Sequence, residues 1–418
     1  MKKRHDAALI WLGLLLFLGI MVSGICLTSI QVQAKEQTLI KIGVLGPQSG
    51  PAGPWGTVGI PAYDAFIELF NKEGFDVGGK NYGFQIIYAD DMNTPEGGAA
   101  AAKKLIYEDK VKFIVGHWTY NFATVAAVTT PAKVILITRT GADIQPVSLG
   151  GSYDAKRMSY VVFGNPSHEQ FVNDAIVLSK AFPGYKRIGF YDSEMDRGPG
   201  WDKLDKALDK LGIRYHHEWY PYGAQDMTPY ITRFAQAGCD ILYGGGDITA
   251  AMLIDKQRWE MGYKDWHVGT AGPIIDPDMY YNIIGKDAAE GFIGQYWAVW
   301  DYKVTKVDPK WTAMAKQAMA MASEKQRKPY TYTGWIGWMP NHIGILYQAM
   351  QKAGTVTDTD AIMKAIRGGT FSTINGTFTM SGEKTYGSPV LFGTPGVLME
   401  LTKGKEVYLF ETPMEPVP

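Results

Sequence analysis

The chain has 418 residues, with 41 Lys and Arg against 42 Asp and Glu, which gives a formal net charge of -1. Because the two signs balance and no long run of like charge occurs, a polyanion partner such as nucleic acid has no electrostatic support. The only cysteines are Cys26 and Cys239, and Cys239 has no partner for an internal disulfide once the N-terminal segment is removed.

Residues 1–34 have the pattern of an export signal. Basic residues at positions 2–4 precede an apolar run over residues 7–30, and the small residues at 32–34 offer a cleavage site. Two alternatives remain open: the apolar run is long enough for an uncleaved anchor, and Cys26 offers a site for lipidation, although Ile25 is a poor residue before it. Export predicts a periplasmic protein, and the remaining roughly 380 residues predict two domains.

Short aliphatic runs alternate with amphipathic, helix-like stretches in the first part of the mature chain. Alternation at this spacing is typical of βαβ units, in which helices cover both faces of a parallel sheet. The expected elements are, in order, strand 39–45, helix 63–71, strand 84–89, helix 97–107, strand 111–116, helix 122–130 and strand 134–138.

The alternation then restarts, which predicts a second α/β half. Its expected elements are strand 160–163, helix 169–182, strand 187–191, helix 199–210, strand 214–220, helix 228–237, strand 240–246, helix 250–261 and strand 266–270. A third set belongs to neither half by order alone: strand 291–299, helices 309–324, 339–353 and 360–366, and short strands to the C-terminus.

Ligands of open parallel sheets bind beyond the carboxyl ends of the strands, where loops lead into helix N-termini. The loops that follow the expected strands are therefore the candidate site. They are "GPQSGPAGPW", "DDMNTP", "GHWTYN" and "TRTGAD" in the first half and "DSEMDRGPGW", "GGGD" and "TAGPI" in the second.

Signatures of catalysis and metal binding are poor in these loops. No strand-to-helix turn contains a P-loop lysine or a G-x-G-x-x-G sequence. The acidic loop that begins at Asp192 has Arg197 where a calcium loop needs glycine. His216 and His217 are adjacent in an expected strand, so they face opposite sides and do not chelate one metal together. We therefore expect no enzyme activity, no cofactor and no metal.

Five segments carry a resemblance that spans the mature chain. They are "IGVLGPQSGPAGPWG", "YADDMNTPEGGAAAAKKLI", "FIVGHWTYNFATVA", "DAAEGFIG" and "INGTFTM". They resemble, in the same order, segments of the Leu/Ile/Val-binding protein family, which are type I periplasmic solute-binding proteins that feed ABC importers. The resemblance implies an α/β fold of two Rossmann-like lobes with parallel sheets, joined by three crossovers, that close on a ligand by hinge motion. It places lobe 1 at 38–161 and 293–372 and lobe 2 at 162–292 and 373–418.

The resemblance also implies ligand-binding residues. Trp55 stands where family members pack an aromatic side chain on the ligand, and the segment from Trp118 through Thr119 and Tyr120 to Asn121 stands where they bind its carboxylate. A second small-residue loop of the family is replaced by one that contains Arg139 and Thr140. The acidic residue that pairs with an amino-acid ammonium is replaced by Ala271, after Thr270.

These departures lead to the hypothesis that the ligand is an organic acid, plausibly aromatic, without an α-amino group. An ammonium buried without a counter-charge costs several kcal/mol. Arg139 could bind a carboxylate with both arms of its guanidinium, helped by neutral donors on Thr140, Tyr120 and Asn121. Trp55, Trp118 and Trp201 could enclose an apolar ring.

Alternatives to this hypothesis stay open. Arg139 could instead pair with Asp143 and be structural. Asp247, Glu194 or Asp196 could supply the missing acid, which keeps leucine, isoleucine, valine or another amino acid as a ligand. The expected function is the binding subunit of an ABC importer, a monomer that delivers its ligand to membrane permease subunits. An extracytoplasmic sensory module is the alternative.

Overall fold

The structure is a computed structural model, and its elements lie in the unit Thr38–Pro418, apart from the first residue of β1. The described residues are 37–50, 52–116, 121–139, 155–164, 167–194, 197, 200–245, 248–272, 274, 277–296, 307–328, 330, 338–392 and 397–409.

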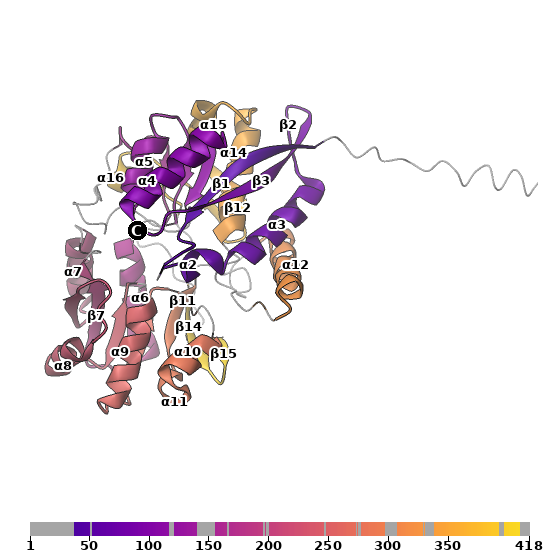
Figure 1. The fold of residues 1–418 in the computed structure, drawn as a ribbon. Coiled ribbons are helices and arrows are strands. Elements are labelled where there is room, and N and C mark those ends of the chain that lie inside the picture. Colours follow the sequence, from indigo (N-terminus) through magenta and orange to yellow (C-terminus); the bar gives the residue numbers. More distant parts are fainter. Residues whose placement is uncertain are drawn as a thin grey trace, which may run out of the picture. The chain divides into compact units, whose positions relative to one another are not determined.

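The first sheet has six strands in the order β2-β3-β1-β4-β5-β6 (Figure 1). β1 pairs in parallel with β4, with Gly43 opposite Ile114, and β5 and β6 continue the parallel arrangement. The antiparallel hairpin β2–β3 forms the other edge. The last five residues of β1 are buried, as expected for a strand with helices on both faces. The strands are β1 (Gln37–Gly46), β2 (Phe75–Val77), β3 (Lys80–Asp90), β4 (Phe113–Gly116), β5 (Ile135–Ile137) and β6 (Val161–Val162).

The helices α3 (Ile60–Glu73), α4 (Pro95–Lys103) and α5 (Phe122–Thr129) follow β1, β3 and β4. Their ends carry the expected local signals. The Thr94 hydroxyl accepts a hydrogen bond from the Gly97 amide at 3.0 Å and so caps α4, which begins with proline. α3 ends at Glu73 and is capped by Gly74, whose φ of 64° suits glycine and whose amide donates to the Phe70 carbonyl. α4 continues into a π-helical turn, η1 (Lys104–Glu108).

The second sheet has seven strands in the order β15-β14-β11-β10-β9-β7-β8. β8, β7, β9, β10 and β11 are parallel, and β14 and β15 are antiparallel additions at one edge (Figure 1). The strands are β7 (Ile188–Ser193), β8 (Tyr215–Tyr220), β9 (Ile241–Gly244), β10 (His267–Thr270), β11 (Ile293–Tyr296), β14 (Val397–Thr402) and β15 (Lys405–Tyr408).

Amphipathic helices flank the second sheet. In α7, Trp201, Leu204 and Leu208 are buried while the lysines between them are exposed, which is the apolar stripe of a helix on a sheet. The helices are α6 (Ser167–Ala181), α7 (Gly200–Leu211), α8 (Thr228–Gln236), α9 (Ile248–Glu260), α10 (Pro277–Ile284) and α11 (Lys286–Ala289). Both predicted α/β halves are confirmed, with every expected helix in place.

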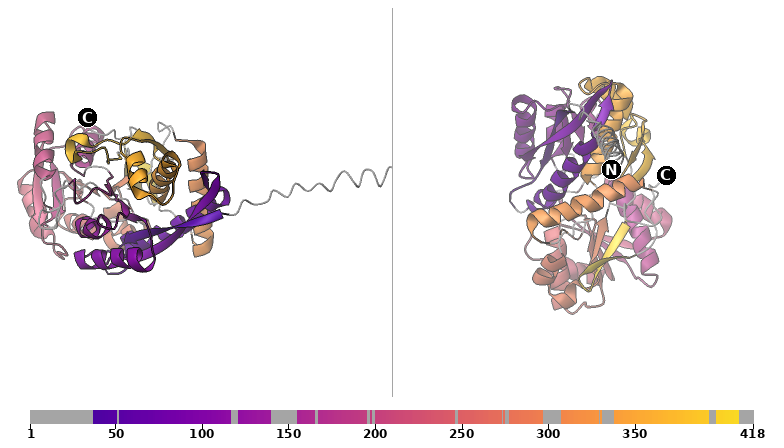
Figure 2. Two further views of the ribbon diagram at one scale, coloured as in Figure 1. Left: turned by 90° about the horizontal axis from the view of Figure 1, so that it is seen from above. Right: turned by 90° about the vertical axis from the view of Figure 1, so that its right-hand side faces the viewer.

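The helices of the third set and the hairpin β12–β13 pack mainly on the first lobe. α12 lies beside α3 (Figure 2). Trp311 stacks there on Phe66 with 6.1 Å between ring centroids, and Lys310 pairs with Glu73 at 2.8 Å. α14 contacts β2, α3 and β12. The elements are α12 (Pro309–Gln326), α14 (Trp338–Ala353), α15 (Thr359–Ile366), β12 (Thr370–Thr373), β13 (Gly376–Thr379) and α16 (Glu383–Tyr386).

The sheets place the lobe boundaries differently from the expected residues 161, 293 and 372. β6 pairs with β5 in the first sheet, and β11, which starts at Ile293, pairs with β10 in the second. The chain after β13 returns to Phe163, which donates to the Val390 carbonyl and accepts from the Phe392 amide, before β14 joins the second sheet. Strand partners so far apart in sequence cannot be assigned from element order alone.

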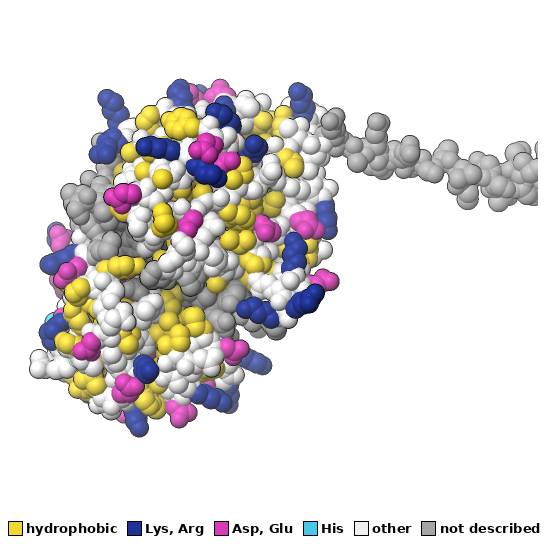
Figure 3. All heavy atoms as spheres, viewed as in Figure 1, with side chains coloured by type: hydrophobic (Ala, Val, Ile, Leu, Met, Phe, Trp, Pro, Cys, Tyr) yellow, Lys and Arg dark blue, Asp and Glu magenta, His cyan; other side chains and the backbone are white. Residues whose placement is uncertain are grey.

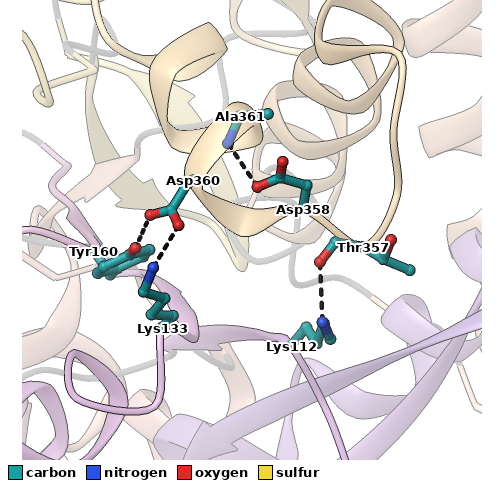
Figure 4. Close-up of polar contacts among 7 residues, drawn as sticks. All are labelled: Lys112, Lys133, Tyr160, Thr357, Asp358, Asp360 and Ala361. Carbon is teal, nitrogen blue, oxygen red and sulfur yellow. Dashed lines mark hydrogen bonds and ion pairs between the residues drawn. The ribbon is translucent and has the colours of Figure 1, made fainter.

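A polar cluster fixes α15 to the first lobe (Figure 4). Lys133 pairs with Asp360 at 2.5 Å, the Tyr160 hydroxyl donates to the same carboxylate, and Lys112 donates to the Thr357 carbonyl at 3.0 Å. The hydrogen bond from Lys133 holds the pKa of Asp360 below its usual value. Lys112, Lys133 and Tyr160 precede β4, β5 and β6, so this cluster lies at the amino ends of the strands and serves attachment.

The surface agrees with the balanced composition. On the face drawn in Figure 3, Lys and Arg side chains are interspersed with Asp and Glu. Across the described ranges, no helix is both long and apolar enough to cross a membrane.

Candidate functional site

Arg139 is a buried cation at the carboxyl end of the first sheet. It comes two residues after β5, and its side chain is 3% exposed. Its guanidinium carbon lies 4.3 Å from the centroid of the Trp338 ring, at the first residue of α14, which is a close cation–π contact. Burial raises the pKa of the Tyr63 hydroxyl, and the charge of Arg139 acts against this rise. The guanidinium thus packs on Trp338 from α14, and its charge reaches Tyr63 of α3.

Gly164 allows the backbone at Arg139 to approach the chain that follows β6. A Cβ atom at position 164 would lie 1.7 Å from the Arg139 carbonyl oxygen, so any side chain there would displace Arg139. The position of the guanidinium therefore depends on a glycine that lies 25 residues further along the chain.

Asn121 joins the loops after β3 and β4. It is 3% exposed, and its amide donates to the Thr94 carbonyl at 3.2 Å. Gly98 makes room for it, because a Cβ there would lie 2.7 Å from the Asn121 amide nitrogen. Burial raises the pKa of the neighbouring Asp91, while the Asn121 amide lowers it. In this structure Asn121 holds two loops together at the carboxyl end of the sheet.

Several predicted site residues or their side chains lie outside the described part of the chain. Trp55 belongs to α2 (Pro54–Thr57), and its side chain is outside the described part. Trp118, Thr119, Tyr120, Thr140 and Asp247 lie outside the described residues, as does Asp143, the alternative partner of Arg139.

Trp201 is packed inside the second lobe. It is 4% exposed, and its ring lies 5.0 Å from that of Phe171, 5.1 Å from that of His217 and 4.8 Å from that of Trp219, between centroids. The cause is the apolar stripe of α7, which turns Trp201 toward the sheet. In this structure Trp201 packs in the core of the second lobe.

Ala271 lies at the carboxyl end of β10. It is 5% exposed, and its amide donates to the Gly244 carbonyl at 2.7 Å. Neither Ala271 nor the buried Thr270 brings a charge to this position. A second close approach occurs nearby, where a Cβ at Gly245 would lie 1.7 Å from a carboxylate oxygen of Asp192, at the end of β7.

A buried polar network beside Ala271 was not identified from the sequence. Gln170 of α6 donates from its amide nitrogen to the Gln295 side-chain carbonyl and lies 3.5 Å from the Ala271 carbonyl. Gln295 donates to Asp174 at 2.7 Å, and Tyr243 donates to Asp174 at 2.8 Å. The sequence did contain a signal for this network. Asp174 lies at helical spacing among the apolar residues of α6, and a charged residue on an apolar stripe indicates a buried polar contact.

In the portion of the chain that is described, no group of three or more His, Cys, Asp or Glu side chains is arranged to hold a metal ion. The two adjacent histidines have different neighbours: His216 contacts Glu218 at 2.8 Å, and His217 contacts Asp205 at 3.4 Å.

Known proteins resemble almost the whole chain. Residues 39–404 match the family model described as periplasmic binding protein. The Leu/Ile/Val-binding protein homolog 3 of Brucella melitensis is 24% identical over 358 residues, which covers 84% of this chain and 89% of that protein.

Two solved structures share the fold. One is a solute-binding protein of an ABC transporter from Rhodopseudomonas palustris in complex with p-hydroxybenzoic acid, with a TM-score of 0.69, 21% identity, and coverage of 91% of this chain and 98% of that one. The other is a leucine-binding protein from Thermotoga maritima, with a TM-score of 0.69, 18% identity, and coverage of 90% and 99%.

Proposed function

The chain belongs to the periplasmic binding protein family, whose members bind small solutes without catalysis, and within it we propose a binder of aromatic carboxylic acids. The protein acts as the extracytoplasmic component of an ABC importer. Its ligand carries a carboxylate and no α-amino group.

The buried cation carries this proposal. Arg139 lies at the carboxyl end of β5 with 3% exposure, and its guanidinium stacks on Trp338. A guanidinium binds a carboxylate through two parallel hydrogen bonds, and its planar face packs on an aromatic ring at the same time. Arg139 therefore supports recognition of the acid group.

The residues of the second lobe support a ligand without an ammonium group. The end of β10 brings Thr270 and Ala271, neither of which is charged. An ammonium held at this position finds no carboxylate on β10, and without one from another element it would lose several kcal/mol of solvation free energy. An acid without an amino group avoids this loss.

The similarity in fold does not decide between the two kinds of ligand, so the choice of ligand class depends on the residues of this chain. The hydroxybenzoate-binding and leucine-binding proteins match the chain with the same TM-score of 0.69, so the fold favours neither ligand. Ala271 stands where amino-acid binders of the family have an acidic residue. This replacement, together with Arg139, favours an aromatic acid as the ligand. The relatives named for leucine, isoleucine and valine make an amino acid the second candidate, with Asp247 as the first residue to consider for its ammonium.

The remaining parts of the proposal follow the family pattern. Trp55 and Trp118 contact the ring, and Thr119, Tyr120 and Thr140 donate to the acid. The two lobes close on the ligand by hinge motion. A cleaved signal at 1–34 delivers the protein to the periplasm, where it works as a monomer with membrane permease subunits.

A thermal-shift screen of the mature chain tests the ligand class. We expect the largest shift with benzoate or a hydroxybenzoate rather than with leucine, isoleucine or valine. Ligand at about a hundred times its Kd adds about 2.7 kcal/mol to the free energy of unfolding, which raises the Tm by several degrees. If an amino acid gives the largest shift, the aromatic-acid proposal is overturned.

Substitution of the cation tests the mechanism. Arg139→Met should weaken binding of the acid by about thirty-fold or more, since one partner of a buried charged pair is removed. Arg139→Lys should recover only part of the affinity because lysine lacks the planar fork. Arg367→Met is the control, since Arg367 lies with the α15 attachment and donates to the Ser159 carbonyl. Unchanged affinity in Arg139→Met, with a folded far-UV spectrum, would show that Arg139 is structural.

A further inference from the structure

The polar network in the second lobe lies at the edge where the ligand is proposed to bind. Gln295 is in the third position of β11, and its backbone amide donates to the carbonyl of Gly272, two residues after β10 ends. Gln170 lies in the first turns of α6 and approaches the Ala271 carbonyl. Both glutamines are therefore level with the loop that replaces the acidic residue of amino-acid binders.

Asp174 is the fully buried acceptor of the network. Its exposure is 0%, and its two carboxylate oxygens accept hydrogen bonds from Gln295 and from the Tyr243 hydroxyl. Burial raises the pKa of Asp174 well above its usual value, although both hydrogen bonds oppose the rise. Burial of a carboxyl group costs free energy of folding, so stability alone does not explain an aspartate at this position.

The hydrogen bonds give each glutamine amide a direction. Gln295 presents its side-chain nitrogen to Asp174, and its own side-chain oxygen accepts from Gln170. The Gln170 nitrogen is thereby directed at two acceptors, the Gln295 and Ala271 carbonyls. A planar amide whose nitrogen faces the network turns its oxygen away from it. Gln295 is fully buried, whereas Gln170 is partly exposed.

We propose that Gln170 is a specificity-determining residue, whose side-chain oxygen accepts a hydrogen bond from a hydroxyl group of the ligand, and that Gln295 and Asp174 are its positioning residues. This rests on the proposed function. It assigns the ligand class as hydroxylated aromatic acids: the carboxylate binds the first lobe and the hydroxyl binds the second. A neutral acceptor in place of a carboxylate suits a hydroxyl donor and disfavours an ammonium.

Titration calorimetry with benzoate and with 3- and 4-hydroxybenzoate tests the assignment. Wild-type protein should bind one of the hydroxybenzoates about three- to tenfold more tightly than benzoate, the range expected for one neutral hydrogen bond. Gln170→Leu should remove this preference and leave the affinity for benzoate within about twofold. Gln348→Leu is the matched control, because Gln348 bonds to the Gly344 and Ser372 carbonyls in the other lobe.

The positioning residues are tested by the same ratio of affinities, which a purely structural role would not change. Asp174→Leu should abolish the preference for the hydroxyl group, since Gln295 is free to turn its amide. Asp174→Asn should retain it, because an asparagine oxygen still accepts from Gln295 and no buried charge remains. Should Asp174→Leu fail to fold, Gln295→Leu serves the same purpose.

The outcomes separate this inference from the proposed function. If none of the three acids binds to wild-type protein, both are overturned. If they bind and Arg139→Met weakens all three, but the hydroxyl preference survives in Gln170→Leu, only the assignment of Gln170 is overturned.

Discussion

Mild acid should destabilise this protein through His217, which is held neutral inside the second lobe. The ring of His217 packs among those of Phe190, Trp201 and Trp219, and its side chain is 13% exposed. Burial, helped by the nearby His216, lowers its pKa to about 4. The Asp205 carboxylate, 3.4 Å away, would favour the charged ring, but burial raises the pKa of Asp205 as well and disfavours a charged pair, so burial prevails.

The size of the effect follows from proton linkage. An unfolded histidine titrates near pH ~6.5, so the folded pKa is lower by about 2.5 units, and each unit is worth about 1.36 kcal/mol. A depressed pKa gives stability that is present above the unfolded value and is lost as the pH falls toward the folded value. The full loss is roughly 3 kcal/mol, and about 2 kcal/mol of it should appear between about pH 7.5 and about pH 5.

Urea unfolding of wild type and His217→Phe at these two pH values measures this contribution, with Trp fluorescence as the signal. Other groups titrate in both proteins, so the informative quantity is the difference between their pH-dependent losses. We expect His217→Phe to lose about 2 kcal/mol less than wild type. The adjacent His216 provides the control, since His216→Phe should keep most of the wild-type loss, because burial is the larger cause of the lowered His217 pKa. Equal losses in wild type and His217→Phe would refute the idea that burial keeps this ring neutral.

Two further substitutions examine the strand ends. Trp55→Ala should weaken ligand binding by about 2 to 4 kcal/mol, as for a central aromatic anchor, with little change in stability; unfolding with intact affinity would make Trp55 a packing residue. Gly245→Ala should lower the free energy of unfolding by about 1 to 3 kcal/mol, because its Cβ would lie 1.7 Å from Asp192. Gly184→Ala, where no atom lies within 4 Å of the new Cβ, is the control and should be neutral in denaturant unfolding; equal effects at both glycines would contradict the close approach.

The amino-acid sequence by itself determined the α/β alternation and where its elements lie. Strands such as β1 and helices such as α7 have apolar patterns of period 2 or 3.6, and these patterns reflect local geometry that a single segment contains. The same reasoning located the carboxyl ends of the strands and singled out Arg139 and Ala271. It could also have placed Trp201 in the core, since Trp201, Leu204 and Leu208 share one stripe.

Only the tertiary structure decided which distant segments meet. β11 joins the second sheet through β10, and the network of Asp174 with Gln295 joins residues 121 positions apart. Two further contacts join segments that are far apart in the sequence. Arg139 stacks on Trp338, and Gly164 leaves room for the backbone at Arg139. Such contacts depend on how finished elements pack against one another, and no periodicity within either segment encodes the identity of its partner.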